Sequence, residues 1–164
     1  MSKLETSMTR RYWQRVGGTL IEDYLIVPPA TGVAPRKLDA VIILDGECRI
    51  ALSPAERSVS LGGRDVIIVQ IKKTLLGDYC LGTHLLGQAY YSRKLVLRRF
   101  AAKSVRSIVL CSKDDNILRE LPEEDGIEII VNDGFATNSQ AMRSEPYLTF
   151  SSRPRACVTA PDAD

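Results

Sequence analysis

The segment DVIIVQIK, residues 65–72, limits the folds open to this chain more than any other. Four apolar β-branched residues follow one another from Val66 to Val69, and such side chains favour strands. An unbroken apolar run is typical of a central strand that is covered on both faces. Gln70 and Lys72 end this run, and because they are two residues apart they should point to the same side.

Hydrophobic spacing and turn residues predict the other elements. The expected helices span residues 5–16, 79–102 and 114–121, and the first is expected to be capped by Thr6 or Ser7. The expected strands span residues 19–27, 38–44, 47–52, 65–72, 106–111 and 126–131. Strand 47–52 is expected to return antiparallel to strand 38–44 across the turn Asp45-Gly46.

Strands that alternate with helices in the second half predict parallel pairing, so the sheet should be mixed. The expected fold class is therefore α/β, with a mixed central β-sheet flanked by helices. Residues 1–132 are expected to form a single domain. Residues 133–164 are polar and rich in proline, which predicts a tail that is partly extended along the surface or mobile.

Composition limits the setting in which the protein works. The chain has 164 residues, 45% of them hydrophobic and 26% charged, which is ordinary for one globular domain. It has neither an apolar run long enough for a membrane span nor the apolar stretch of a secretory signal near its start. A cytoplasmic location without a membrane partner is therefore expected.

Cysteine and histidine usage argues against a zinc site. The four cysteines are widely separated, and the chain has one histidine, whereas zinc sites need closely spaced ligands. Reduced thiols are expected instead.

Basic residues are concentrated although the formal net charge is only +2. A stretch of fourteen residues contains six basic side chains and no acid, and a second cluster lies near the start of the chain. Local patches of this kind bind phosphates, but a solvated helix face explains them equally well. The first set is Arg93, Lys94, Arg98, Arg99, Lys103 and Arg106; the second is Arg10, Arg11 and Arg15.

A set of polar residues suits phosphodiester hydrolysis. Asp39 begins an earlier strand, from which it can lie beside Gln70 and Lys72. Carboxylate and amide oxygens are ligands for Mg²⁺, which activates water and offsets phosphate charge, and a lysine stabilises the developing negative charge. Glu22 on the first strand is a further candidate ligand. The alternatives are a strand end in solvent for Gln70 and Lys72, a loop contact for Asp39, and a solvated Glu22.

Three segments, KLDAVII, DVIIVQIKK and LLGQAYYSRKL, resemble the PD-(D/E)XK nuclease superfamily over about residues 10–131. This resemblance implies a restriction-endonuclease-like core of αβββαβ order, with an extra helix and strand here. It implies that Asp39 binds metal and that Lys72 is the catalytic lysine, and Glu22 is a weaker match to a further acid. Gln88 and Tyr91 resemble the glutamine–tyrosine motif of the RecB-like branch, with a spacing one residue shorter.

Gln70 departs from the superfamily pattern, which usually has Glu or Asp in this place. The change removes one negative charge and should weaken metal binding. The end-cleaving nuclease subunit of some heteromeric transposases is similar, with glutamine before x-Lys, so the change does not exclude catalysis.

The resemblance implies a metal-dependent nuclease that hydrolyses phosphodiester bonds with Mg²⁺ or Mn²⁺. DNA is favoured over RNA as substrate and partner, in DNA processing, repair, transposition or defence, and a homodimer or larger complex is expected. The implied catalytic residues are Asp39, Gln70 and Lys72; the metal ligands are Asp39, Gln70 and Glu22; the nucleic-acid contacts are Gln88, Tyr91, Arg93, Lys94, Arg98 and Arg99.

Two other functions stay open. One is a nuclease-like module without catalysis that binds nucleic acid or a partner protein, which Gln70 suggests. The other is a structural or assembly protein in which the motif is a coincidence. In that case Asp39, Gln70 and Lys72 would be scattered over the fold.

Overall fold

A single six-stranded mixed sheet forms the centre of the computed structural model, which describes residues 2–71, 82–113 and 115–131. Its strand order is β3-β1-β2-β4-β5-β6. The neighbours β1–β2 and β2–β4 are antiparallel, whereas β1–β3, β4–β5 and β5–β6 are parallel. The strands are β1 (Thr19–Val27), β2 (Arg36–Ile43), β3 (Arg49–Ala51), β4 (Asp65–Ile71), β5 (Ser104–Cys111) and β6 (Ile127–Val131).

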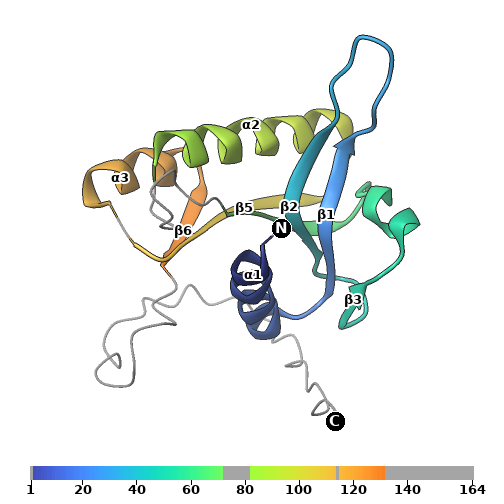
Figure 1. Ribbon diagram of the computed structural model, residues 1–164, viewed down its shortest axis with the longest axis horizontal. Coiled ribbons are helices and arrows are strands. Elements are labelled where there is room, and N and C mark those ends of the chain that lie inside the picture. Colours follow the sequence, from blue (N-terminus) through green and yellow to red (C-terminus); the bar gives the residue numbers. More distant parts are fainter. Residues whose placement is uncertain (1, 72–81, 114, 132–164) are drawn as a thin grey trace.

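Helices cover both faces of the sheet (Figure 1). Helix α1 (Lys3–Val16) lies on one face, and α2 (Thr83–Arg99) and α3 (Asn116–Glu124) lie on the other. A short 3₁₀ helix, η1 (Pro54–Ser58), precedes β4. The predicted class, α/β with a mixed sheet flanked by helices, is confirmed, and so is the predicted order of helices and strands.

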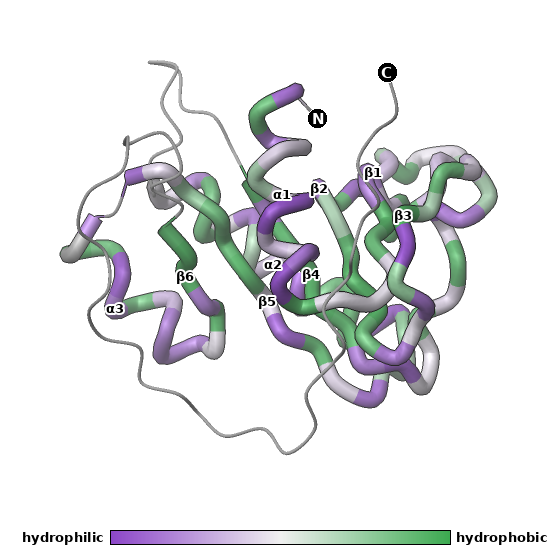
Figure 2. Tube along the Cα trace, turned by 90° about the horizontal axis from the view of Figure 1, so that it is seen from below, coloured by the Kyte–Doolittle hydropathy of each residue, from purple (hydrophilic) through white to green (hydrophobic). Residues whose placement is uncertain are grey.

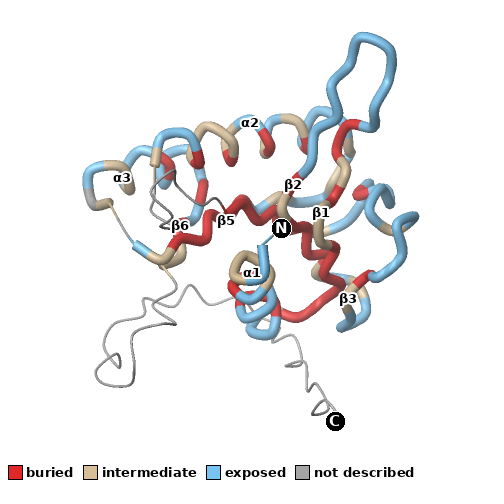
Figure 3. The backbone as a smooth tube through the Cα atoms, in the orientation of Figure 1, coloured by how far each residue is buried: buried red, intermediate tan, exposed pale blue. Residues whose placement is uncertain are grey.

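The strand β4 is buried between two apolar layers, as its sequence predicts. Val69 and Ile71 belong to a cluster with Met8 and Trp13 of α1, whereas Ile68 belongs to the cluster on the α2 face. Figure 2 shows hydrophobic residues running along the central strands, and Figure 3 shows the same strands as buried. Alternation along β4 therefore directs Gln70 toward the α2 face.

The prediction that segment 47–52 pairs with the second strand is wrong. Strand β3 pairs parallel with β1, through Leu20 and Ile50 among others. Strand β2 has β1 and β4 on its two sides, so neither of its edges is left for a hairpin partner. Thr19 Oγ1 donates a hydrogen bond to the Glu47 carbonyl at 2.7 Å, which ties this segment to β1.

The start of the first helix also differs from the prediction. Helix α1 begins at Lys3, because Ser2 caps it and not Thr6 or Ser7. The Ser2 hydroxyl accepts a hydrogen bond from the Glu5 N–H, and the Glu5 carboxylate accepts one from the Ser2 N–H. This reciprocal pair satisfies two backbone donors at the helix start.

The described cysteines differ in their oxidation state. Cys111 carries a buried, reduced thiol, but Cys48 is disulfide-bonded, so the expectation of reduced thiols is wrong at Cys48.

Lys72 and the predicted tail, residues 133–164, lie outside the described residues. No helix in the described part of the chain combines the length and apolar character that a membrane span requires.

Candidate functional site

Asp39 joins two strands at the point where their backbone pairing stops. The last pair between β2 and β4 is Ala40 with Val69, so Asp39 stands one residue beyond it, level with Gln70. The Asp39 Oδ2 atom accepts a hydrogen bond from the Ile71 N–H at 2.7 Å. A side chain thus replaces the backbone acceptor at this end of the sheet, and the β4 terminus is tied to β2.

The environment of Asp39 disfavours its charged form. Burial raises the pKa of this carboxyl to about 6, the Ile71 N–H opposes that rise, and the nearby carboxylates of Glu5 and Asp23 add to it. Desolvation and like charges both penalise an ionised carboxylate. A cation bound beside Asp39 would relieve this penalty, and ionisable groups with raised pKa values are common at functional sites.

Asp23 gives β1 an irregular backbone beside Asp39. Its φ of 52° is the only positive value at a non-glycine residue in the described part of the chain. Asp23 lies between the pairs that join Glu22 to Ala40 and Tyr24 to Leu38, so it is level with Asp39. Such backbone conformations cost free energy and are often found at functional sites.

Gln70 is fully buried and both ends of its amide are hydrogen-bonded. Its Nε2 donates to Ser92 Oγ at 3.1 Å, and its Oε1 accepts from Gln88 Nε2 at 3.0 Å. The interpretation of Gln70 as a strand end in solvent is therefore wrong, because the side chain has no exposed surface. Two residues of α2 hold this amide in place on the α2 face of β4.

Ser92 rather than Tyr91 accompanies Gln88 at the site. Residues four apart lie on the same side of a helix, and Ser92 falls in the buried series Leu85, Ala89, Ser92 and Val96. Tyr91 is 69% exposed, which explains why its ring does not reach Gln70. The sequence contained this signal, because Ser92 shares the helical phase of the apolar residues.

Glu22 is engaged with α1. Its two carboxylate oxygens accept hydrogen bonds from Arg10 Nε at 2.9 Å and from Arg10 Nη2 at 3.2 Å. Such bidentate pairing offsets the negative charge of Glu22. Asp23 and Glu5, rather than Glu22, are the carboxylates whose charge acts on Asp39, and the sequence analysis missed both.

The basic residues of α2 fall into two groups. Arg93 is half-buried, and its Nη1 donates to the Asp125 carbonyl at 3.0 Å, so it binds the turn before β6. Lys94, Arg98 and Arg99 are exposed, and Lys94 Nζ lies 5.2 Å from the centre of the Tyr90 ring. The second group is available to an anionic partner, whereas Arg93 stabilises the packing of α2 against the end of α3.

The described residues fit a divalent cation only in part. Asp39 is a suitable ligand, since Mg²⁺ keeps several waters and takes one or two carboxylates from the protein. Gln70 fits less well, because its oxygen already accepts the Gln88 amide. Within residues 2–71, 82–113 and 115–131 no three acidic, histidine or cysteine side chains meet as a metal-binding group.

No family model, curated protein or solved structure matches this chain. The roles of its residues therefore rest on their geometry and chemistry. Asp39 and Gln70 lie on neighbouring strands at the same end of the sheet, but the charge of Glu5 of α1 acts on Asp39, whereas Gln70 is hydrogen-bonded to α2 on the other face. The position of Lys72 relative to them lies outside the described residues.

Ser92→Ala should destabilise the protein, because it leaves the buried Nε2 of Gln70 without an acceptor. The expected loss in the free energy of unfolding is about 1–3 kcal/mol, measured by urea denaturation. Ser107→Ala is the matched control, since the buried Ser107 hydroxyl has no hydrogen-bond partner among the described residues. Its removal should be neutral or stabilising. Equal effects of the two changes would contradict the assigned role of Ser92.

Proposed function

We propose that this protein is a metal-dependent nuclease that hydrolyses phosphodiester bonds, with DNA as the favoured substrate. The observation that carries the proposal is the hydrogen bond of the Asp39 carboxylate to the Ile71 N–H, which fixes an acid beside the end of β4. Gln70 precedes this end and Lys72 follows it in the sequence. These three residue types offer an acid, an amide and an ammonium group, which is the chemistry that cleavage requires.

The order of elements supports a restriction-endonuclease-like core. Helix α1 is followed by β1, β2 and β4, then by α2 and β5, and the sheet order β1-β2-β4-β5 is antiparallel in its first half and parallel in its second. Strand β3 and the pair α3–β6 are additions to that core. In this proposal Mg²⁺ or Mn²⁺ at Asp39 supplies an activated water and positive charge for the phosphate.

The proposal assigns a role to each residue of the candidate site. Asp39 holds the cation, and the backbone N–H of Ile71 orients its carboxylate. Gln88 and Ser92 fix the Gln70 amide on the α2 face at the same end of the sheet. Lys72 stabilises negative charge on the phosphate, and the exposed Lys94, Arg98 and Arg99 of α2 attract the substrate backbone.

A second candidate is a nuclease-like module that binds nucleic acid or a partner protein without cutting. The observation that favours it is the Gln70 amide, whose oxygen is already used by Gln88. This candidate predicts salt-dependent binding of nucleic acid that is insensitive to divalent cations.

Lys72→Ala should lower cleavage by roughly 10²–10³-fold while the protein stays folded, because it removes the positive charge that opposes the developing anion. The measurement is cleavage of labelled duplex DNA, single-stranded DNA and RNA with Mg²⁺ or Mn²⁺. Lys73→Ala, which removes the same charge one residue later, is the matched control and should keep activity.

The outcomes of this assay separate the two candidates. Absence of cleavage by the wild-type protein with either metal, together with retained binding of nucleic acid, supports the non-cutting module. Equal cleavage by wild type and Lys72→Ala would contradict the nuclease mechanism.

A further inference from the structure

A hairpin arm projects from the end of the sheet that carries Asp39. Residues 28–37, which we name the β1–β2 arm, join β1 to β2 and are all exposed. In Figure 1 the arm rises beyond the end of α2, and Figure 3 shows its surface as exposed. Asp39 lies two residues after Lys37, the last residue of the arm. The arm and the candidate site therefore share one end of the molecule.

The arm is ordered by its own backbone. Ala30 and Val33 exchange two hydrogen bonds, Val33 N–H to the Ala30 carbonyl at 2.9 Å and Ala30 N–H to the Val33 carbonyl at 3.4 Å. Gly32, with a φ of 74°, makes the turn between them. Three prolines, Pro28, Pro29 and Pro35, restrict the flanking backbone, since proline fixes φ. An arm of this kind loses little conformational entropy when it binds a partner.

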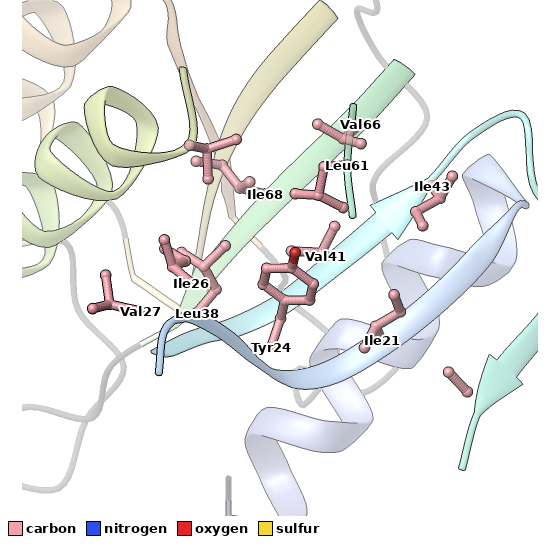
Figure 4. Close-up of a cluster of buried hydrophobic side chains, with 12 residues drawn as sticks. Ile21, Tyr24, Ile26, Val27, Leu38, Val41, Ile43, Leu61, Val66 and Ile68 are labelled. Atoms are coloured by element: carbon pink, nitrogen blue, oxygen red, sulfur yellow. The ribbon is translucent and has the colours of Figure 1, made fainter. Parts of the chain in front are cut away.

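The base of the arm is held against α2. Val27, Ile26 and Leu38 are buried in the cluster that also contains Val96 of α2, and Figure 4 shows these three where the hairpin leaves the sheet. The ring of Tyr24 meets that of Phe100, which caps α2, with 6.2 Å between centroids. The last turn of α2 is therefore fixed relative to the base of the arm.

The charges of the arm and of the last turn of α2 are all positive. Arg36 and Lys37 lie at the base of the arm, and Arg98 and Arg99 end α2. All four are exposed, and none forms an ion pair with another described residue. Residues 25–38 contain no acid, whereas the loop after β2 contains Asp45 and Glu47. Four positive charges without a described ion-pair partner thus lie on this side of the site.

We propose that the β1–β2 arm and the last turn of α2 form a clamp for duplex nucleic acid, in which Arg36 and Lys37 bind phosphates beside the cleaved bond. Arg36 is three residues from Asp39 along β2, about 10 Å at roughly 3.3 Å per residue. That span corresponds to about three base-pair steps along the helix axis, at roughly 3.4 Å each. The clamp rests on the proposed function, to which it adds the class of substrate and its mode of contact.

The test is binding of a labelled duplex DNA in EDTA, which prevents cleavage. Each phosphate contact contributes about 0.9 to the slope of log affinity against log salt. Arg36→Ala should therefore weaken binding by roughly eightfold at 0.1 M salt, and Arg36→Ala with Lys37→Ala by roughly sixtyfold, with a slope lower by about 2. Circular dichroism confirms that these exposed changes leave the fold intact.

Arg57→Ala is the matched control. Arg57 is exposed on η1, away from α2, and forms no ion pair with another described residue. Its loss removes the same charge and should change the affinity by less than twofold. If Arg57→Ala weakens binding as much as Arg36→Ala, general charge and not the arm is responsible, and the clamp is wrong.

The failure of the clamp is distinct from the failure of the proposed function. A wild-type protein that binds neither duplex DNA nor duplex RNA contradicts both. A wild-type protein that binds duplex, together with an unchanged double variant, contradicts the clamp alone. If that double variant instead loses binding to a polyglutamate peptide, the arm serves an acidic protein partner.

Discussion

Asp39→Asn is expected to raise the free energy of unfolding by about 2–3 kcal/mol at pH 8, because it removes a buried charge and keeps an oxygen for the Ile71 N–H. Under the proposed function the same change should lower cleavage roughly a thousandfold, since the carboxylate that holds the cation is lost. A gain in stability together with a loss of activity is the mark of a residue that is retained for function.

The pH dependence of this effect follows from the raised pKa of Asp39. Since the pKa in the folded protein is about 6, above its value in the unfolded chain, the folded state holds the proton more tightly. The contribution of Asp39 to wild-type stability is thus fully present below pH ~4 and is lost as pH rises to about 6. Asp39→Asn and wild type should be equally stable near pH 4 and differ most above pH 6.

Asp65→Asn supplies a control of opposite sign. Hydrogen bonds from Lys103 and Ser104 lower the pKa of Asp65, so its ionised form stabilises the fold and the variant should be less stable at pH 8. Urea denaturation of the three proteins at pH 4.5 and pH 8 measures both effects. A less stable Asp39→Asn at pH 8 would mean that a positive group already compensates the Asp39 carboxylate.

The fold was largely predictable because the spacing of apolar residues marks its strands clearly. The apolar run of β4 predicted a central strand, and Gln70 near its end lies on the opposite face from Val69 and Ile71, as strand alternation requires. The alternation of strands and helices after residue 65 predicted parallel pairing, and β4–β5 and β5–β6 are parallel.

The position of β3 was not predictable from local sequence. The dipeptide Asp45-Gly46 is a typical hairpin turn, but a Cβ atom at Gly46 would lie 2.4 Å from Thr19 Oγ1. Gly46 is therefore needed for close packing against β1. Which edge of a sheet receives a strand depends on edges already occupied, and this is a property of the whole sheet.

The candidate site was predictable in its residues more than in its contacts. Spacing alone put Gln70 on one face of β4, and helical phase would have selected Ser92 over Tyr91. The position of Asp39 level with Gln70 depends on the register of β2 against β4, and the φ of Asp23 depends on packing. Neither leaves a pattern in the sequence. Glu5 was missed because its effect on Asp39 depends on how α1 packs against the sheet.

Gln70→Glu is expected to separate the two candidate functions. It restores the acid that the superfamily usually has, without a change in shape, but places a carboxylate in a fully buried position on the strand next to that of Asp39. Without metal this should cost about 2–4 kcal/mol at pH 8, since burial and like charge both oppose ionisation. The introduced carboxyl should have a raised pKa in the folded protein, so the cost should decrease as pH falls toward the pKa of the unfolded chain.

A nuclease site and a non-cutting module respond differently to Mg²⁺ in this variant. If Asp39 and the new carboxylate bind the cation together, Mg²⁺ at a hundredfold excess over its dissociation constant should restore about 2.7 kcal/mol. Gln14→Glu is the control, because it makes the same amide-to-acid change at an exposed position of α1, on the other face of the sheet from Gln70. Calorimetric unfolding with and without Mg²⁺ compares the two variants. Stabilisation by Mg²⁺ that is confined to Gln70→Glu supports the nuclease. Equal stabilisation of both variants, or none, shows that this end of the sheet does not hold a metal. That outcome favours the module that binds without cutting.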